Sequence, residues 1–397
     1  MSIGSPLDPR TEPLNRKREW REWSGYYAAS QYEHLHIHEY VGVRHAAVLI
    51  DVSPLYKYRL SGPDAVRLID RVITRDATKI KPGQVIYTPW CDEHGKVIDD
   101  GTIARLDDDT FRWTSAEPHL RWFELNARGL NVAVEDVSER TAAIALQGPL
   151  ARDVLAEATG TDWADLPYYH RRSARAGKVE IDVSRTGYTG DLGYELWVDA
   201  AQATQLWDRL MTVGRPWAIR PAGMLTLDMV RLEAGLILIE VDYTSSKHAL
   251  IPSQNYSPYE IGLGRLVNLD KVGDFVGRRA LAAERDSGGP ARRLVGLAMD
   301  YESIESLYEA QDLPIGVSTA TWREQRPVYS RGRQVGRATS GTWSPTLKRH
   351  IALASVEPAF EAVGSRLELE WTVEGRRGRA AAEVVPLPFF DPPRKRA

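Results

Sequence analysis

The segment from Ser184 to Leu196, SRTGYTGDLGYEL, places charged side chains around a glycine-rich turn. Its glycines at 187, 190 and 193 allow backbone turns that a Cβ would hinder. The residues before the turn, KVEIDVSR, and those after it, YELWV, alternate as half-buried strands do. The pattern therefore predicts strand, glycine loop, strand, with Glu195 in the second strand. An exposed surface turn would have the same pattern, so this segment alone assigns no chemistry.

Two adjacent carboxylates, Asp99 and Asp100, lie in GKVIDDGTIARL. The segment reads as the second strand of a hairpin whose turn spans 92–95. Successive side chains of a strand point to opposite faces, so only one of the two can face a given cavity. The spacing alone leaves open which one does. A carboxylate in such a cavity can relay a proton or stabilise developing positive charge.

The run His34, His36 and His38 could place three imidazoles on one strand face and bind zinc. The apolar positions of residues 33–49 are compatible with a helix instead, which disperses the rings, so we expect no metal. The sequence contains no GxxxxGK[ST] and no GxGxxG after a strand. We therefore expect no site for nucleotide phosphates.

Length and composition limit the class of protein. A chain of 397 residues predicts about two to four domains, and 43% hydrophobic with 26% charged residues is typical of a soluble globular protein. A net charge of -3 gives no electrostatic reason to expect nucleic acid or a membrane surface as a partner, and we expect the basic Arg394–Arg396 end to be solvated. The single cysteine, Cys91, excludes internal disulfides. No apolar run reaches about 18 residues, and the amino-terminal segment MSIGSPLDPRTEPLNRKREW lacks a hydrophobic signal core, so we expect a cytoplasmic protein.

The element pattern is mixed. Residues 59–140 alternate strands with helices, as in α+β domains, and further helices are expected at 64–73 and 200–211. Pro221 is expected to begin the helix AGMLTLDMVRLEAGL, which Gly235 ends. After the linker-like DSGGPAR, short strands separated by Gly and Pro predict an all-β barrel or sandwich.

Several segments occur in one order along the chain: LIDVSPLYKYRLSGPDA, GKVIDDGTIARL, RTGYTGDLGYEL, RLEAGL, DFVGRRAL and TSGTWSPTLKRHIALASV. In this order the chain resembles the aminomethyltransferase (glycine cleavage T-protein) family from about residue 35 to 390. The resemblance implies an α+β fold, a three-domain cloverleaf of two interleaved α+β domains and a C-terminal β-barrel around a central folate cavity. The domains it implies are residues 1–58 with 140–222, residues 59–139 with 223–285, and residues 291–397. It also implies transfer of one-carbon units to or from the nitrogens of tetrahydrofolate.

The resemblance assigns roles to individual residues. Glu195 would accept the two adjacent N–H donors of a reduced pterin, and Arg231 would fix Glu195 or the pterin carbonyl, although an intrahelical pair of Arg231 with Asp228 is the structural alternative. Asp100 would be the catalytic carboxylate and Asp99 its solvated partner. Further cofactor contacts are expected from Tyr188 and Asp99, and from Trp113 and Trp343, for which core packing is the alternative.

The chain also departs from the glycine cleavage enzyme. Ser53-Pro54-Leu55 replaces an expected Ser-His-Met, and Ser115-Ala116 replaces an Asn-Ala pair, which disfavours a lipoyl-bound aminomethyl donor and its carrier protein. An apparent insertion after RLEAGLILIEVD brings Tyr243, Lys247 and His248. In a demethylase the departing group must be protonated or stabilised. Tyr243 is the candidate acid, with Lys247 and His248 as helpers; a solvated loop that orders a domain contact is the alternative.

These observations predict a tetrahydrofolate-dependent one-carbon transferase of the demethylase type. Its donor would be a small O-methyl, methylenedioxy or N-methyl compound, aromatic or not. Two alternatives remain open from the sequence: an aminomethyltransferase acting on a lipoylated carrier, and a folate-binding or iron-sulfur assembly protein without donor chemistry.

Overall fold

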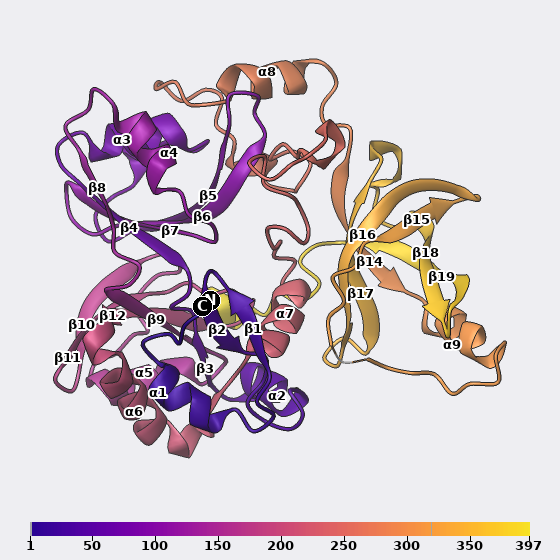
Figure 1. Ribbon diagram of the computed structural model, residues 1–397, viewed down its shortest axis with the longest axis horizontal. Coiled ribbons are helices and arrows are strands. Elements are labelled where there is room, and N and C mark those ends of the chain that lie inside the picture. The colour runs from indigo at the N-terminus through magenta and orange to yellow at the C-terminus, as the bar shows by residue number, and fades with distance from the viewer. Residues whose placement is uncertain (1, 319) are drawn as a thin grey trace.

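The computed structural model describes residues 2–318 and 320–397, and the strands of this part of the chain form four sheets. The smallest is a hairpin of β1 (Trp20–Trp23) and β2 (Tyr26–Ala29). The other three sheets each belong to a separate body with its own hydrophobic core, and Figure 1 shows the barrel standing apart from the two bodies that hold the other sheets.

The first body is built on a six-stranded sheet, in the order β10 (Arg171–Ala176), β11 (Val179–Ser184), β12 (Gly193–Asp199), β9 (Thr141–Gln147), β3 (Val48–Asp51) and β13 (Arg220–Pro221). Neighbours pair antiparallel except β13 with β3. Alternation along the strands gives the sheet two apolar faces. One packs on α5 (Ala151–Thr159) and α6 (Ala203–Val213), and the other on α2 (Ile37–His45) and α7 (Met224–Glu233). The short α1 (Asp8–Thr11) lies beside α6.

The second body holds a five-stranded antiparallel sheet, in the order β5 (Val85–Cys91), β6 (Val97–Arg105), β7 (Thr110–Ser115), β4 (Tyr56–Ser61) and β8 (Ala133–Asp136). Its core packs on α3 (Ala65–Val72) and α4 (Leu120–Ala127). Residues 237–290, including α8 (Arg278–Asp286), lie against the β5–β6 hairpin (Figure 1).

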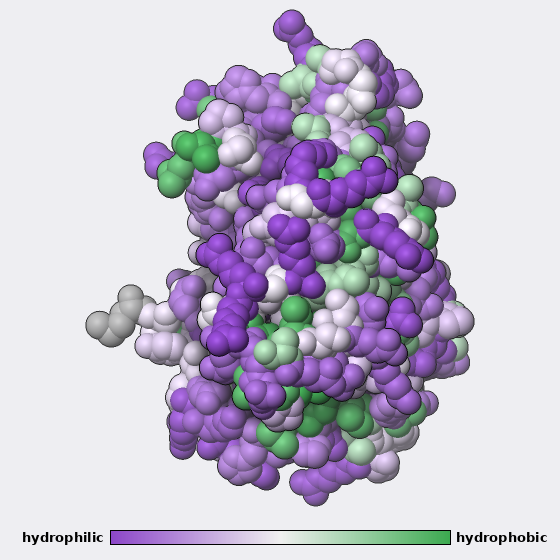
Figure 2. Space-filling view, turned by 90° about the vertical axis from the view of Figure 1, so that its right-hand side faces the viewer, coloured by the Kyte–Doolittle hydropathy of each residue, from purple (hydrophilic) through white to green (hydrophobic). Residues whose placement is uncertain are grey.

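The C-terminal body is a closed antiparallel barrel of β14 (Arg293–Met299), β17 (Arg349–Val356), β16 (Arg333–Ser344), β15 (Arg326–Ser330), β18 (Arg366–Val373) and β19 (Arg376–Val385). Pairing of β14 with β19 closes it, and α9 (Tyr301–Glu309) packs on β19. The outer side of β16 contacts α7 of the first body. On the face shown in Figure 2, hydrophilic residues predominate and hydrophobic ones form small separate groups.

Two expectations about the ends of elements are wrong. Pro221 does not begin α7; it lies in β13, because Ala222 continues the strand by donating its N–H to Leu49 at 2.9 Å. The helix begins only after Gly223, where an added Cβ would lie 2.6 Å from the carbonyl oxygen of Ser30. The basic C-terminus is not simply solvated either, since Arg394 pairs with the buried Asp191 at 2.7 Å.

In the described part of the chain, no helix is long and apolar enough to cross a bilayer.

Candidate functional site

The glycine hairpin has the predicted form. β11 and β12 pair antiparallel with Ser184 opposite Glu195, and the loop between them contains Gly190 at φ +71°. Gly187 and Gly193 are also required by packing inside the hairpin. An added Cβ at these positions would lie 2.1 and 2.2 Å from Oε1 of Gln147, whose amide donates to two backbone carbonyls of the hairpin. The missing side chains therefore make room for an internal glutamine that holds the loop.

Glu195 is half-buried on β12 and has spare hydrogen-bonding capacity. Thr186 donates a hydrogen bond to one of its carboxylate oxygens, and no other described residue does so. Burial raises the pKa of Glu195, while the Thr186 hydroxyl and the nearby Arg112 lower it. Arg112 itself lies over the Trp197 ring at 4.1 Å and pairs with Asp182 at 2.5 Å. The second oxygen of Glu195 is thus available to a ligand.

Asp100 lies on β6 with its carboxylate held by two tyrosines. Tyr87 donates to Oδ2 at 2.6 Å, and Tyr243 donates to Oδ1. Burial and then the neighbouring charge of Asp99 raise the pKa of Asp100 to about 7, and both hydroxyls lower it. Burial and the Asp100 charge raise the pKa of both tyrosines well above its usual range, so both hydroxyls stay protonated.

Arg231 is fully buried in α7 and is fixed by acidic partners. Its Nε donates to Asp228 at 2.9 Å and its Nη1 to Asp242 at 2.5 Å. The pair with Asp228, expected as the structural alternative, is therefore present, and no described residue joins Arg231 to Glu195. The remaining nitrogen, Nη2, is buried without a partner among the described residues.

Tyr188 of the glycine loop lies near Arg231 and Asp100. Its hydroxyl donates to the carbonyl of Ile237. Burial raises the pKa of Tyr188 strongly; the charge of Arg231 lowers it and that of Asp100 raises it. Tyr188 therefore lies near both Arg231 and Asp100, and Asp100 in turn is hydrogen-bonded to Tyr243.

Five other sequence-predicted residues lie elsewhere. Asp99 is not solvated: it is completely buried and pairs with His119 at 2.9 Å. Trp113 is also completely buried, edge-on to Trp90 at 5.2 Å, because β7 turns it into the core of the second body. Trp343 lies in the barrel, edge-on to His350 at 5.0 Å.

The two helpers expected beside Tyr243 do not lie with it. The Lys247 ammonium reaches His119, behind the sheet, at 3.0 Å. His248 is exposed and pairs with Glu240 at 3.0 Å. Both follow Tyr243 in a loop that turns around the end of β6, so they emerge on the other side of the sheet from Asp100. Among the described residues no group of three His, Cys, Asp or Glu could hold a metal ion.

Tyr87 is the residue beside Asp100 that the sequence reasoning missed. The register of β5 with β6 places Pro89 opposite Asp100, so Tyr87 is a diagonal neighbour on the same face. Counting outward from the predicted turn at 92–95 would have found it. Gln147 and His119 lack any such local signal, since their partners are distant in sequence.

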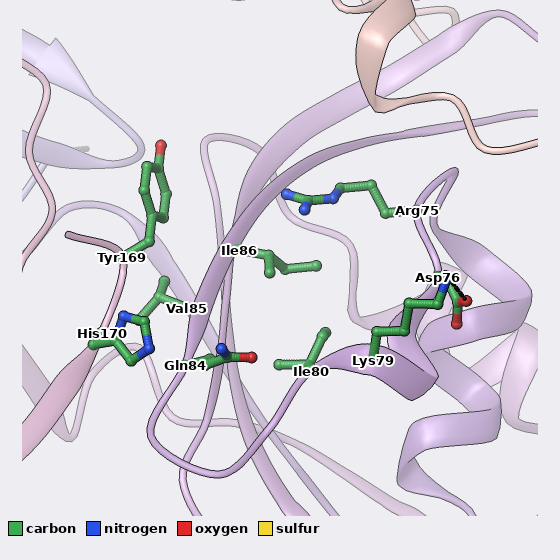
Figure 3. Close-up of a pocket in the computed structure, with 9 residues that line it drawn as sticks. All are labelled: Arg75, Asp76, Lys79, Ile80, Gln84, Val85, Ile86, Tyr169 and His170. Atoms are coloured by element: carbon green, nitrogen blue, oxygen red, sulfur yellow. Dashed lines mark ion pairs between the residues drawn. The ribbon is translucent and has the colours of Figure 1, made fainter. Parts of the chain in front are cut away.

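A pocket of about 220 Å³ opens between β5 and the residues that precede β10. Figure 3 shows Tyr169 and His170 on one side of it and Arg75, Asp76 and Lys79 on the other. The charge of Glu195 contributes to raising the pKa of Tyr169, after burial and its neighbour Tyr168. Arg75 donates to the Tyr87 carbonyl at 3.1 Å. One lining residue, Tyr169, thus lies near Glu195, and β5, the strand that carries Tyr87, forms a wall of the pocket.

The chain is similar to known proteins over most of its length. The GCVT N-terminal domain matches residues 14–271, and the glycine cleavage T-protein C-terminal barrel domain matches residues 313–391. An aminomethyltransferase from Moorella thermoacetica is 36% identical over 94% of each chain. A trimethylamine-oxide aldolase from Ruegeria pomeroyi is 35% identical over 91% of this chain, which spans 44% of that protein.

Among solved structures, glycine cleavage system aminomethyltransferase T from Bartonella henselae superposes with a TM-score of 0.82. It covers 98% of this chain and 99% of its own, at 24% identity, and so supports the fold. The family models cover most of the chain, and the Moorella relative matches nearly all of it. The chain therefore belongs to the aminomethyltransferase (glycine cleavage T-protein) family of one-carbon transferases.

Proposed function

We propose that this protein is a tetrahydrofolate-dependent one-carbon transferase of the demethylase type. It would move a methyl or methylene group from a small donor to N5 of tetrahydrofolate. The observation that carries the proposal is the Asp100 carboxylate held by two tyrosine hydroxyls, one of which, Tyr243, comes from the insertion. A carboxylate and a phenol in contact can both accept and deliver a proton, which demethylation requires.

The residues present fit a reduced pterin. Glu195 keeps one oxygen free for a pair of adjacent N–H donors, and Arg231 Nη2 is a buried donor without a described partner, suited to a ring carbonyl. Tyr188 lies within electrostatic reach of Arg231 and Asp100. Tetrahydrofolate would supply N5, the nitrogen that receives the one-carbon group.

The protein's own groups account for the protons. Because burial and Asp99 raise the pKa of Asp100 to about 7, its carboxylate can take up and release a proton near neutral pH. Tyr243 keeps its O–H at that pH and can donate it to the departing heteroatom, while Asp100 Oδ1, hydrogen-bonded to the same hydroxyl, can replace it. The proton lost by the nucleophilic nitrogen and the proton gained by the departing group thus pass through one hydrogen-bonded pair, and charge balances.

The surroundings favour a small donor with an apolar body. Leu55 packs in the same hydrophobic cluster as Tyr188, at a position where the family resemblance expects methionine. Tyr87 and Tyr243 add two more rings around Asp100. An O-methyl or methylenedioxy aromatic compound or an N-methyl compound would suit these contacts.

A second candidate is transfer from an aminomethyl group on a lipoyl carrier protein. The 36% identity to the Moorella aminomethyltransferase over 94% of the chain favours it.

One experiment separates the two candidates. Purified protein should be incubated with tetrahydrofolate and either methoxyaryl, methylenedioxyaryl and N-methyl donors or an aminomethyl-lipoyl carrier. Methylated or methylenated folate from a small donor supports the proposal. Ammonia release from the carrier alone contradicts it and establishes the second candidate.

Two further predictions accompany this proposal. A cytoplasmic location stays a prediction. The division into residues 1–58 with 140–222, 59–139 with 223–285, and 291–397 stays a proposal, supported by the three separate cores, although the packing of α7 on α2 favours assigning α7 to the first domain.

A further inference from the structure

A chain of hydrogen bonds runs behind Asp100, from a surface lysine into the core of the second body. Lys247 Nζ lies 3.0 Å from His119 Nδ1, and His119 Nε2 lies 2.9 Å from Asp99 Oδ2. Asp99 Oδ1 accepts the backbone N–H of Asp100 at 2.7 Å. An ammonium can only donate, so Nδ1 accepts and Nε2–H donates to Asp99. The lysine therefore fixes the tautomer of the histidine.

The inner members of this chain are buried and ordered. Side chains of Asp99 and His119 are each 1% exposed. The His119 ring lies edge-on to Trp90 at 5.3 Å, and its backbone N–H donates to the Tyr58 hydroxyl at 2.7 Å. Asp99 also accepts the N–H of Glu117 at 3.1 Å. Such contacts fix both side chains in single orientations.

Burial shifts the pKa values of His119 and Asp99 in opposite directions. It lowers the pKa of His119 to about 3, so the ring stays neutral at physiological pH. Burial raises the pKa of Asp99 to about 7, against backbone hydrogen bonds and the Lys247 charge, which lower it. The lysine is therefore the cation that favours ionised Asp99.

One loop contacts both carboxyl groups. Tyr243 donates to Asp100 on one face of β6, and Lys247, four residues later, reaches His119 on the other. Two hydrogen bonds lie between them. Ser245 Oγ donates to the Ile98 carbonyl at 2.6 Å, and the backbone N–H of Ser246 donates to the carbonyl of Val97 at 2.8 Å. The loop thus clamps the end of the strand that carries Asp99 and Asp100.

We propose that Lys247, His119 and Asp99 form a positioning network for Asp100, in which Lys247 keeps a negative charge on Asp99 behind the reactive carboxyl. The inference rests on the proposed function of Asp100. It makes Lys247 a positioning residue rather than a helper that contacts the departing group. The charge on Asp99 raises the pKa of Asp100, so loss of that charge lowers it.

Other ionisable groups face the network, and Lys247→Met and Asp99→Asn leave all of them in place. Those that face Asp100 are Tyr87, Tyr243 and Tyr188; those that face Asp99 or His119, apart from Lys247, are Glu117 and His248.

The test is Lys247→Met, a change at an exposed position. Carboxyl titration by infrared difference spectroscopy, with the Asp100 band assigned through Asp100→Asn, should move to lower pH by about one unit. The acid limb of the kcat profile for folate methylation should move with it. Asp99→Asn should give the same shift, and adding Lys247→Met to it should produce no further change.

Two variants serve as controls. Lys247→Arg keeps a cation and should restore the wild-type titration, and His248→Gln, one residue further in the same loop, should leave it unchanged. An unshifted Asp100 band in both Lys247→Met and Asp99→Asn overturns the inference, as does a fall in kcat without a shift. Because the titration is read without substrate, full turnover by Asp100→Asn would contradict the proposed function while the network remained testable.

Discussion

Replacing Tyr243 with phenylalanine removes one of the two hydroxyls that donate to Asp100. Hydrogen bonds to charged groups contribute about 1.5–3 kcal/mol, and about 1.4 kcal/mol corresponds to one pKa unit. The pKa of Asp100, which burial and Asp99 raise to about 7 and the two hydroxyls lower, should therefore rise by about one to two units. At about pH 7.5 the ionised fraction would fall from about three quarters to between about a quarter and about 3%.

The assay is the pH dependence of folate methylation with the donor identified by the screen. If the carboxylate is the active form, activity is lost as pH falls through the pKa of Asp100, so Tyr243→Phe moves the acid limb to higher pH. If Tyr243 also protonates the departing group, the alkaline plateau falls by about 10²–10⁴-fold. Tyr87→Phe is the matched control, because it removes the other donor: the limb should move in the same direction and the plateau should remain. Unchanged limbs in both variants would refute the reasoning.

Three further changes test other parts of the structure. Glu195→Ala should weaken tetrahydrofolate binding by about 1.5–3 kcal/mol, or about 10- to 150-fold in Kd by calorimetry, whereas exposed Glu240→Ala should not; an unaltered Kd removes Glu195 from the site. Trp113→Ala should cost about 3–5 kcal/mol of unfolding free energy in a denaturant titration with little change in folate Kd. A weaker folate Kd with unchanged unfolding free energy would instead show that the ring contacts the folate. Lys271→Met should lower the free energy of unfolding by about 3–5 kcal/mol, since the buried ammonium donates to three backbone carbonyls and a carboxylate around the end of α3. A denaturation midpoint no lower than that of the exposed Lys79→Met variant would contradict this prediction.

The sequence correctly predicted the structural features that depend on residues close together in the chain. Alternation places β11 and β12 on either side of the glycine loop, and it sends Asp99 and Asp100 to opposite faces of β6. The short C-terminal strands form the barrel. These features follow from side-chain period and turn chemistry, which act over a few residues.

The function of individual side chains depended on segments far apart in sequence. Asp99 is buried because His119 and Lys247, from two other segments, hydrogen-bond in line behind it. Gly187 and Gly193 are glycines because Gln147 fills the space beside them. Strand alternation determines that two side chains diverge, but it contains no information about what packs on either face. The sequence by itself therefore determined the family, the elements and the pair of candidate carboxylates, whereas only the tertiary structure decided which groups surround each carboxylate and on which side of the sheet Lys247 lies.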